Sequence, residues 1–193
     1  MRISFLRRFA TSPAIVAAAL LAGCGDDDNP MKPQPPPAYA VASSPENVLA
    51  NMIRAYASRD SVEYRMALDY PDYKGTSKDQ TDGTQVQLFW IDELKHIQAF
   101  AKATTITSVH FDMGQPSSWD RLTSDDVAHP EWAVIQIAGS QFLLRVDDTI
   151  EGTLTVNSPN ETHIFRFKPT TPAPSSSTDT LWTLTQWEEV LEP

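Results

Sequence analysis

The sequence has very little cysteine: a single residue, Cys24, among 193. One cysteine cannot form an intramolecular disulfide, a cysteine-based metal site or a CxxC redox pair. The domain must therefore be stabilised by its core alone. Signals for metals and cofactors are also missing. The histidines lack the HxxxH or HExxH spacing of a zinc site, and there is no P-loop, dinucleotide-binding glycine motif or GxSxG. The sequence predicts no metal and no cofactor; the four scattered histidines are His96, His110, His129 and His163.

Positive charge is scarce as well. The chain has 15 Lys and Arg residues against 25 Asp and Glu, which gives a formal net charge of −10. Such a chain repels phosphate backbones and anionic lipid headgroups, so nucleic acid is not an expected partner. The acidic surface is interpreted as a feature that keeps the protein soluble.

The apolar run near the N-terminus is too short to cross a membrane. It extends from Ala14 to Ala22, about nine residues against the roughly 20 that a spanning helix needs. It follows a basic segment that contains Arg2, Arg7 and Arg8. A basic end followed by a short apolar run is the layout of an export signal.

This run ends in Leu21-Ala22-Gly23-Cys24, which resembles the lipobox of bacterial lipoproteins. The resemblance implies cleavage before Cys24 and acylation of that cysteine, palmitate included. Each buried methylene contributes about 0.8 kcal/mol, so two or three chains anchor a protein stably. In such lipoproteins an Asp after the cysteine favours the inner membrane; Gly25 stands there, so the outer membrane is favoured, with the domain facing the periplasm or the surface. An ordinary cleaved signal and twin-arginine export through Arg7-Arg8 are the alternatives.

Composition then divides the chain into three parts. Residues 1–23 are expected to be the signal peptide, residues 24–43 the lipidated cysteine with a Pro-rich tether, and residues 44–193 the folded domain. The tether has almost no large apolar residue to bury, so it should be extended and reach up to about 60 Å from the lipid. A ligand for a proline-binding partner is the alternative interpretation of its prolines, which are Pro30, Pro33, Pro35, Pro36 and Pro37.

Helical signals open the folded part. Ser44-Pro45 is typical of an N-cap followed by Pro at the first helical position, with Ser43-x-x-Glu46 as a competing capping box. Asp60 should cap a second helix. Residues 74–83 are polar and glycine-containing, and are expected to form a loop. A third helix follows Trp90, with Asp92 as its cap and a buried stripe at Leu94, Ile97, Phe100 and Ala101.

Alternating patterns replace helical ones after Ala103. Strands are expected over residues 105–113 and 132–146, the latter with a bend at Gly139-Ser140. Residues 152–156 and 162–168 should pair as a hairpin, and residues 181–190 form the closing strand. In a regular closing strand Trp182 and Trp187 point to opposite faces, and Trp182 is expected to be the buried one.

The order of these elements resembles the nuclear transport factor 2-like (cystatin-like, SnoaL-like) superfamily. Ser44-Pro45-Glu46-Asn47-Val48-Leu49 with Arg54-Ala55-Tyr56 is similar to its first helix, and Trp182-Thr183-Leu184-Thr185-Gln186-Trp187 is similar to the closing strand of lipoproteins with this fold. The resemblance implies an α+β fold in which three N-terminal helices pack on a curved, mainly antiparallel sheet around a conical cavity. It would cover residues 44–190.

The superfamily contains isomerases, dehydratases and polyketide cyclases as well as non-catalytic binders. Its isomerases need a tyrosine on the first helix and a carboxylate after the second. An ungapped count places these at Met52 and Thr76, which cannot do that chemistry, so no catalytic residue is predicted. The expected function is therefore a lipid-anchored envelope module for ligand binding or protein assembly. A small-molecule enzyme of the polyketide-cyclase or isomerase type is one alternative, and a purely structural envelope protein is another.

Four aromatic residues are candidates for the lining of the cavity: Tyr56, Trp90, Trp132 and Trp182. They could stack on a small apolar or sugar-like ligand, or simply fill the core between helices and sheet. Expected partners are the membrane through Cys24, a small apolar ligand or an envelope protein, and a second copy of the chain through the sheet.

Overall fold

The computed structural model describes residues 38–78, 84–170 and 180–191. From Ala40 onward these residues belong to one compact unit. The predictions for the signal peptide, for Cys24 and for the tether up to residue 37 lie outside the described residues. Within the described part, no helix is both long and apolar enough to cross a membrane.

The first two helices begin where the sequence predicted. Ser44 caps α1 (Pro45–Ser58) by accepting a hydrogen bond from the Asn47 N–H at 3.2 Å, and Pro45 occupies the first turn. Arg59 ends α1 in the left-handed region, with φ of 57°. Asp60 then caps α2 (Ser61–Ala67), accepting from the N–H groups of Val62 and Glu63. Local capping chemistry therefore sets the turn between the two helices.

Residues 74–83 do not form the expected loop throughout. Lys74–Lys78 is strand β1, and it pairs antiparallel with β2 (Gln85–Phe89). On its other edge β1 pairs parallel with β9 (Leu181–Leu191). These neighbours supply the backbone partners that hold a polar, glycine-containing segment in a strand, so the propensity of the segment did not decide its structure.

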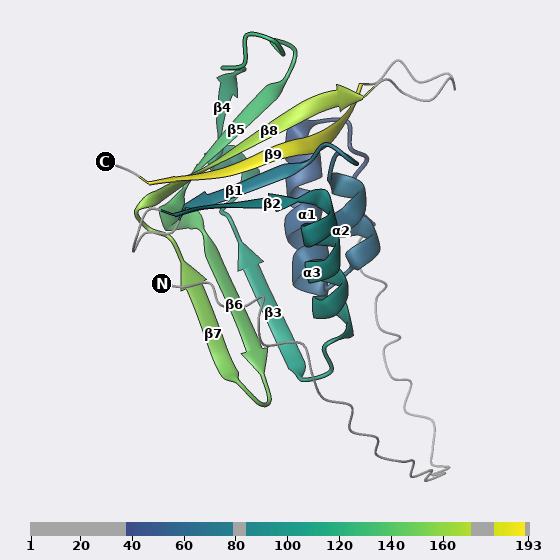
Figure 1. The fold of residues 1–193 in the computed structure, drawn as a ribbon, viewed down its shortest axis with the longest axis vertical. Coiled ribbons are helices and arrows are strands. Elements are labelled where there is room, and N and C mark those ends of the chain that lie inside the picture. Colours follow the sequence, from purple (N-terminus) through teal and green to yellow (C-terminus); the bar gives the residue numbers. More distant parts are fainter. Residues whose placement is uncertain (1–37, 79–83, 171–179, 192–193) are drawn as a thin grey trace. The chain divides into compact units, whose positions relative to one another are not determined.

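The described residues form an α+β fold with three α-helices and mainly antiparallel strands, as predicted. Six strands form one sheet in the order β2-β1-β9-β8-β5-β4, and three form a second sheet in the order β3-β6-β7. Figure 1 shows the two sheets running in different directions, with the helices beside them. Helix α1 packs against β3, β5 and β9, so it contacts both sheets. The remaining elements are α3 (Trp90–Lys102), β3 (Ile106–Asp112), β4 (Asp120–Thr123), β5 (Ala133–Ala138), β6 (Leu143–Asp148), β7 (Gly152–Asn157) and β8 (Glu161–Thr170).

The described chain passes between the two sheets at four points, and two of these crossings touch. One crossing is the short 3-10 turn Gly139–Gln141 between β5 and β6, where the sequence predicted a bend. The other lies between β7 and β8, so the predicted hairpin of these two strands is wrong: β7 pairs with β6, and β8 pairs with β5 and β9. A Cβ on Gly139 would lie 1.9 Å from the Ser158 carbonyl oxygen and 2.4 Å from that of Glu161. Only glycine permits this approach.

A bulge in β9 overturns the expectation for its two tryptophans. Phe167 pairs with Leu184, but Arg166 pairs with Gln186, so Thr185 is the extra residue. The bulge puts Trp182 and Trp187 on the same face of the strand instead of opposite faces. The Trp187 ring lies 5.2 Å from the ring of fully buried Phe165. Trp187 therefore faces the interior, and the prediction that it faces outward is wrong.

Residues just before the expected first residue of the domain form hydrogen bonds with it. Ala40 exchanges two hydrogen bonds with the Asn51 side chain, and the Trp182 N–H donates to the Ala42 carbonyl at 2.9 Å. The Asn47 side chain donates to the carbonyl of Val41. Residues 40–42 thus bind to α1 and to the start of β9.

Candidate functional site

A carboxylate occupies the interior between the helices and the sheet. Glu93, in the first turn of α3, is only 7% exposed, and its Oε2 accepts a hydrogen bond from the Tyr64 hydroxyl at 3.1 Å. Burial is the main cause that raises the pKa of Glu93 to about 7, although the hydrogen bond from Tyr64 acts in the opposite direction. The charges of Asp92 and Glu189 raise the pKa further. Near neutral pH, Glu93 is therefore present in both its protonated and its ionised forms.

Three tyrosines surround this carboxylate. Burial raises the pKa of Tyr56, Tyr64 and Tyr73, and in each case the charge of Glu93 raises it further. The Tyr56 hydroxyl lies 3.0 Å from Nε2 of His96, whose own pKa is lowered by burial. We call these five residues the interior cluster. It brings together α1, α2, α3 and the segment that leads into β1.

One hydroxyl of the interior cluster lacks a hydrogen-bond partner within residues 38–78, 84–170 and 180–191. Tyr73 is 1% exposed, and its hydroxyl forms no hydrogen bond with any described residue. Leaving a buried polar group without a partner costs about 1–3 kcal/mol, so such a group in a native protein calls for an explanation. Gly75 lies beside it: a Cβ there would be 3.1 Å from the Tyr73 hydroxyl oxygen. The absence of a side chain at Gly75 leaves the hydroxyl uncrowded on that side.

Aromatic rings enclose the cluster. The ring of Tyr56 lies 5.0 Å from that of Phe100 on α3 and 5.2 Å from that of Phe111 on β3. The rings of Tyr56 and Tyr64 are 5.8 Å apart, and Phe111 packs edge-on against Phe142. These contacts surround the polar atoms with apolar surface, which strengthens electrostatic interactions there.

A second polar group lies on the inner face of β8 and β9. His163 is fully buried, and its Nε2 lies 2.9 Å from the Ser158 hydroxyl. The Trp187 indole N–H donates to Nδ1 of His163, so the ring is neutral with its proton on Nε2. Burial lowers the pKa of His163 to about 4. Burial likewise raises the pKa of nearby Glu189 to about 6. The interior therefore holds two carboxylates that resist ionisation.

The structure places the four predicted lining residues in different parts of the domain. Tyr56 belongs to the interior cluster. Trp90 meets Tyr70 at the surface, with ring centroids 4.5 Å apart. Trp132 stacks on His129 at 4.3 Å, in the segment between β4 and β5, and Trp182 lies at the start of β9. None of the four forms a ring contact with another.

Sequence reasoning missed Glu93. The buried stripe of α3 consists of Glu93, Ile97 and Phe100, whereas Leu94 is only partly buried. The signal was available, because Glu93 is four residues before Ile97 and seven before Phe100 and so shares their helix face. A charged residue in an apolar stripe is easily assigned to solvent. The predicted N-cap of α3 is wrong by three residues: Phe89 is the N-cap, and Asp92 lies in the first turn, where its side chain accepts a hydrogen bond from the Phe89 N–H at 3.2 Å.

The positions expected from isomerases are occupied as the sequence indicated. Met52 is fully buried in the core, and Thr76 pairs with Glu188 in the sheet. The structure nevertheless offers a tyrosine and a carboxylate in contact elsewhere, as Tyr64 on α2 and Glu93 on α3. Proton-transfer chemistry in this protein would therefore use α2 and α3, and not the positions of Met52 and Thr76.

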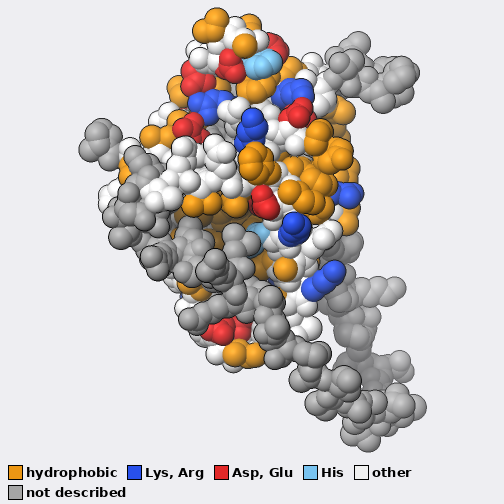
Figure 2. Space-filling view, in the orientation of Figure 1, with side chains coloured by type: hydrophobic (Ala, Val, Ile, Leu, Met, Phe, Trp, Pro, Cys, Tyr) orange, Lys and Arg blue, Asp and Glu red, His pale blue; other side chains and the backbone are white. Residues whose placement is uncertain are grey.

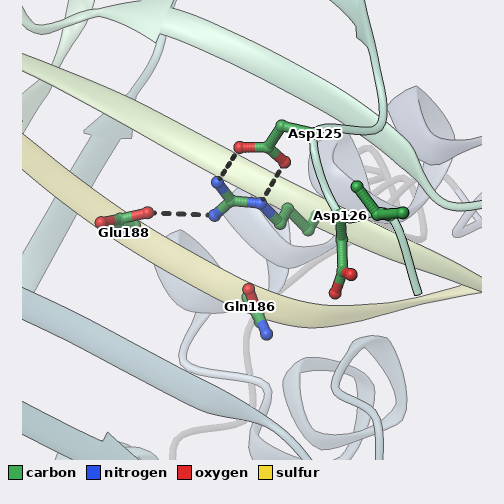
Figure 3. Close-up of a pocket in the computed structure, with 6 residues that line it drawn as sticks. Asp125, Asp126, Gln186 and Glu188 are labelled. Carbon is green, nitrogen blue, oxygen red and sulfur yellow. Dashed lines mark hydrogen bonds and ion pairs between the residues drawn. The ribbon is translucent and has the colours of Figure 1, made fainter. Parts of the chain in front are cut away.

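A polar pocket of about 370 Å³ lies on the opposite face of the six-stranded sheet (Figure 3). Arg166 on β8 is at its centre; it donates to both carboxylate oxygens of Asp125, at 3.0 and 2.8 Å, and to Glu188 on β9 at 3.0 Å. Two carboxylates thus neutralise the one cation, so the pocket does not attract anions. Asp126, Val127 and Gln186 complete the lining.

In the described ranges, no group of three His, Cys, Asp or Glu side chains could hold a metal ion.

Comparison with known proteins identifies the fold. No protein-family model matches the chain, and no curated protein matches it. Among solved structures, an NTF2-like protein of unknown function in nutrient uptake from Rhodospirillum rubrum aligns with a TM-score of 0.50 at 10% identity, covering 78% of this chain and 99% of that one. An NTF2-like protein of unknown function from Pseudomonas putida aligns with a TM-score of 0.44 at 10% identity, covering 77% and 84%. At this identity the likeness concerns the fold alone, and the described domain has the NTF2-like fold.

Proposed function

We propose that the chain is a lipid-anchored protein of the bacterial cell envelope whose NTF2-like domain binds a small, largely apolar molecule in its interior. The anchor and the location rest on the sequence: the basic segment, the apolar run and the Leu21-Ala22-Gly23-Cys24 ending. Residues 1–23 would be removed, and residues 24–43 would link the lipid to the domain. The outer membrane is the proposed location, because Gly25 stands where an inner-membrane signal would have Asp.

The observation that carries the ligand-binding proposal is the buried Tyr73 hydroxyl, which forms no hydrogen bond with the part of the chain that the structure describes. A polar atom on a ligand would satisfy it, and Tyr64 and Glu93 could supply a second hydrogen bond. The rings of Tyr56 and Phe111 offer apolar surface to the rest of the ligand. Mostly apolar walls with a few converging polar groups are the usual composition of small-molecule sites.

Replacing Cys24 by serine should abolish the anchor. The Cys24→Ser protein cannot accept diacylglycerol, so it should lose labelling by radioactive palmitate and leave the membrane fraction. Fractionation and labelling of cells that express either protein measure both effects. A Cys24→Ser protein that remains in the membrane fraction after a high-salt wash would show that lipid on Cys24 is not the anchor.

Tyr73→Phe should weaken ligand binding by about tenfold, because the substitution removes one buried hydrogen bond and keeps the ring. Native mass spectrometry of the purified protein would detect a co-purified molecule, and titration of that molecule would give the affinities. Tyr70→Phe, at a tyrosine that is 68% exposed, is the matched control and should bind like the wild type. Equal affinities for all three proteins would place the ligand away from Tyr73.

A proton-transfer enzyme is the second candidate function, and one observation favours it. Glu93 has its pKa near 7 and contacts a tyrosine hydroxyl in a buried setting, which suits general acid–base catalysis at neutral pH. The recovered molecule decides between the two functions. An enzyme would convert it on incubation and lose that activity in Glu93→Gln, whereas a binding module would return it unchanged.

A further inference from the structure

A second feature of the domain lies at its surface, away from the interior cluster. Met66 and Leu68 at the end of α2, Tyr70 in the following turn and Trp90 at the start of α3 line a notch of about 400 Å³. The rings of Tyr70 and Trp90 meet edge to face, with centroids 4.5 Å apart. Arg65 completes the lining. We call this the Tyr70–Trp90 notch.

The notch lies within a wider apolar surface. Met66 is 64% exposed and Tyr70 is 68% exposed, which is unusual for such large side chains. Val62 is one turn before Met66 on the same side of α2, and it is also exposed. Phe89 and Ile91 flank Trp90 in sequence, and both are about half exposed. Figure 2 shows hydrophobic side chains gathered over this part of the molecule. Contiguous apolar surface of this kind marks sites of protein association.

Arg65 is the charged member of the lining, and no described residue forms an ion pair with it. The acidic residues of the adjacent turn are engaged elsewhere: Lys168 binds Asp69 at 3.2 Å and approaches Asp72 at 3.9 Å. The guanidinium therefore remains available on the rim of an apolar notch. The chain has a net charge of −10, so Arg65 makes the notch locally positive in a protein that is negative overall.

We infer that the Tyr70–Trp90 notch is a docking site for a partner protein segment that presents a large apolar side chain next to a carboxylate. The apolar side chain would enter between Tyr70 and Met66 and contact Trp90. The carboxylate would receive paired hydrogen bonds from Arg65, the geometry in which arginine binds carboxylates best. Tryptophan, tyrosine and arginine are the residues that dominate binding energy at protein interfaces, and this notch contains all three.

Selection of random displayed peptides on the full chain tests this inference. The recovered peptides should share an Asp or Glu beside a large apolar residue. Met66→Glu should weaken their binding at least about tenfold, because it puts a charge where the apolar side chain enters. Arg65→Gln should weaken the acidic peptides about tenfold, but it should not affect versions that carry Asn or Gln at the acidic position.

Val127→Glu is the matched control, because Val127 is 96% exposed and lies in the pocket on the other face of the sheet. It should bind the peptides like the wild type, and circular dichroism should show all variants folded. The inference is overturned if no peptide is selected, if the selected peptides lack the acid, or if Met66→Glu binds them normally. It is also overturned if Met66→Glu instead abolishes self-association in sedimentation or binding to phosphatidylethanolamine–phosphatidylglycerol vesicles.

Discussion

Replacing Glu93 by glutamine should stabilise the folded domain by about 3 kcal/mol at pH 8 and change its stability little at pH 4.5. Glutamine keeps an oxygen that can accept the hydrogen bond from Tyr64, and it removes the ability to ionise. The expected gain is large because Glu93 is 7% exposed and has no cationic partner among the described residues.

The direction of this pH effect on stability follows from how many protons the folded and unfolded states bind. The pKa of Glu93 is about 7 in the folded protein and about 4.5 when the chain is unfolded. Between these values the folded state holds more protons than the unfolded state, so the wild type loses stability as pH rises from 4.5 to 7. Above pH 7 the loss is complete. Glutamine does not titrate. The difference in unfolding free energy between the variant and the wild type should therefore grow as pH rises from 4.5 to 7.

Urea unfolding at several pH values between 4.5 and 8 measures the difference. The low pKa of His163 makes both proteins lose stability as pH falls below 6.5, and this contribution cancels between them. Glu151→Gln is the matched control: Glu151 is exposed at the turn between β6 and β7, and its replacement should leave the pH profile unchanged. A gain in Glu93→Gln that is equal at pH 4.5 and pH 8 would contradict a buried carboxylate that titrates.

Trp187→Ala should cost about 3 kcal/mol of unfolding free energy, the lower end of the range for large aromatic residues. The bulge at Thr185 turns the indole inward, where it packs on Phe165 and donates to His163. The truncation removes this packing and leaves Nδ1 of His163 without its donor. The value is at the lower end because Trp187 is partly exposed.

The comparison within β9 makes this test specific. Val190 follows Trp187 on the same strand and is 38% exposed, so Val190→Ala should cost less than about 1 kcal/mol. Equilibrium unfolding in urea gives both values. If Trp187→Ala were as mild as Val190→Ala, the indole would have to face solvent, and β9 would be regular after all.

The helices could be predicted because their signals are local. Ser44 and Asp60 carry capping chemistry that is complete within three residues of the helix start. Strand β1 could not be predicted, because Lys74–Lys78 has no apolar pattern. Its structure depends on pairing with β9, more than 100 residues away in the sequence. The bulge at Thr185 was equally inaccessible, since it is defined only by register against β8.

The interior cluster was predictable in part. Tyr56 was identified as a lining residue, and it does lie in the cluster. Trp90 and Trp132 were expected there by residue type, but they lie elsewhere because large aromatic residues suit surfaces and cores alike. Glu93 was missed because its charge indicates a solvent-facing position, although its spacing from Ile97 and Phe100 places it on the buried face of α3.

The contact at Gly139 links the interior to a distant part of the fold. Two of the chain crossings between the sheets meet there with no room for a methyl group, so the spacing between the six-stranded and three-stranded sheets is fixed at that point. Tyr56 packs on Phe111 of the three-stranded sheet, while His163 and Glu189 belong to the six-stranded sheet. The size of ligand that the interior can accept is therefore governed partly by a glycine that no ligand would touch, and enlarging the site would require changes at this junction as well as in its lining.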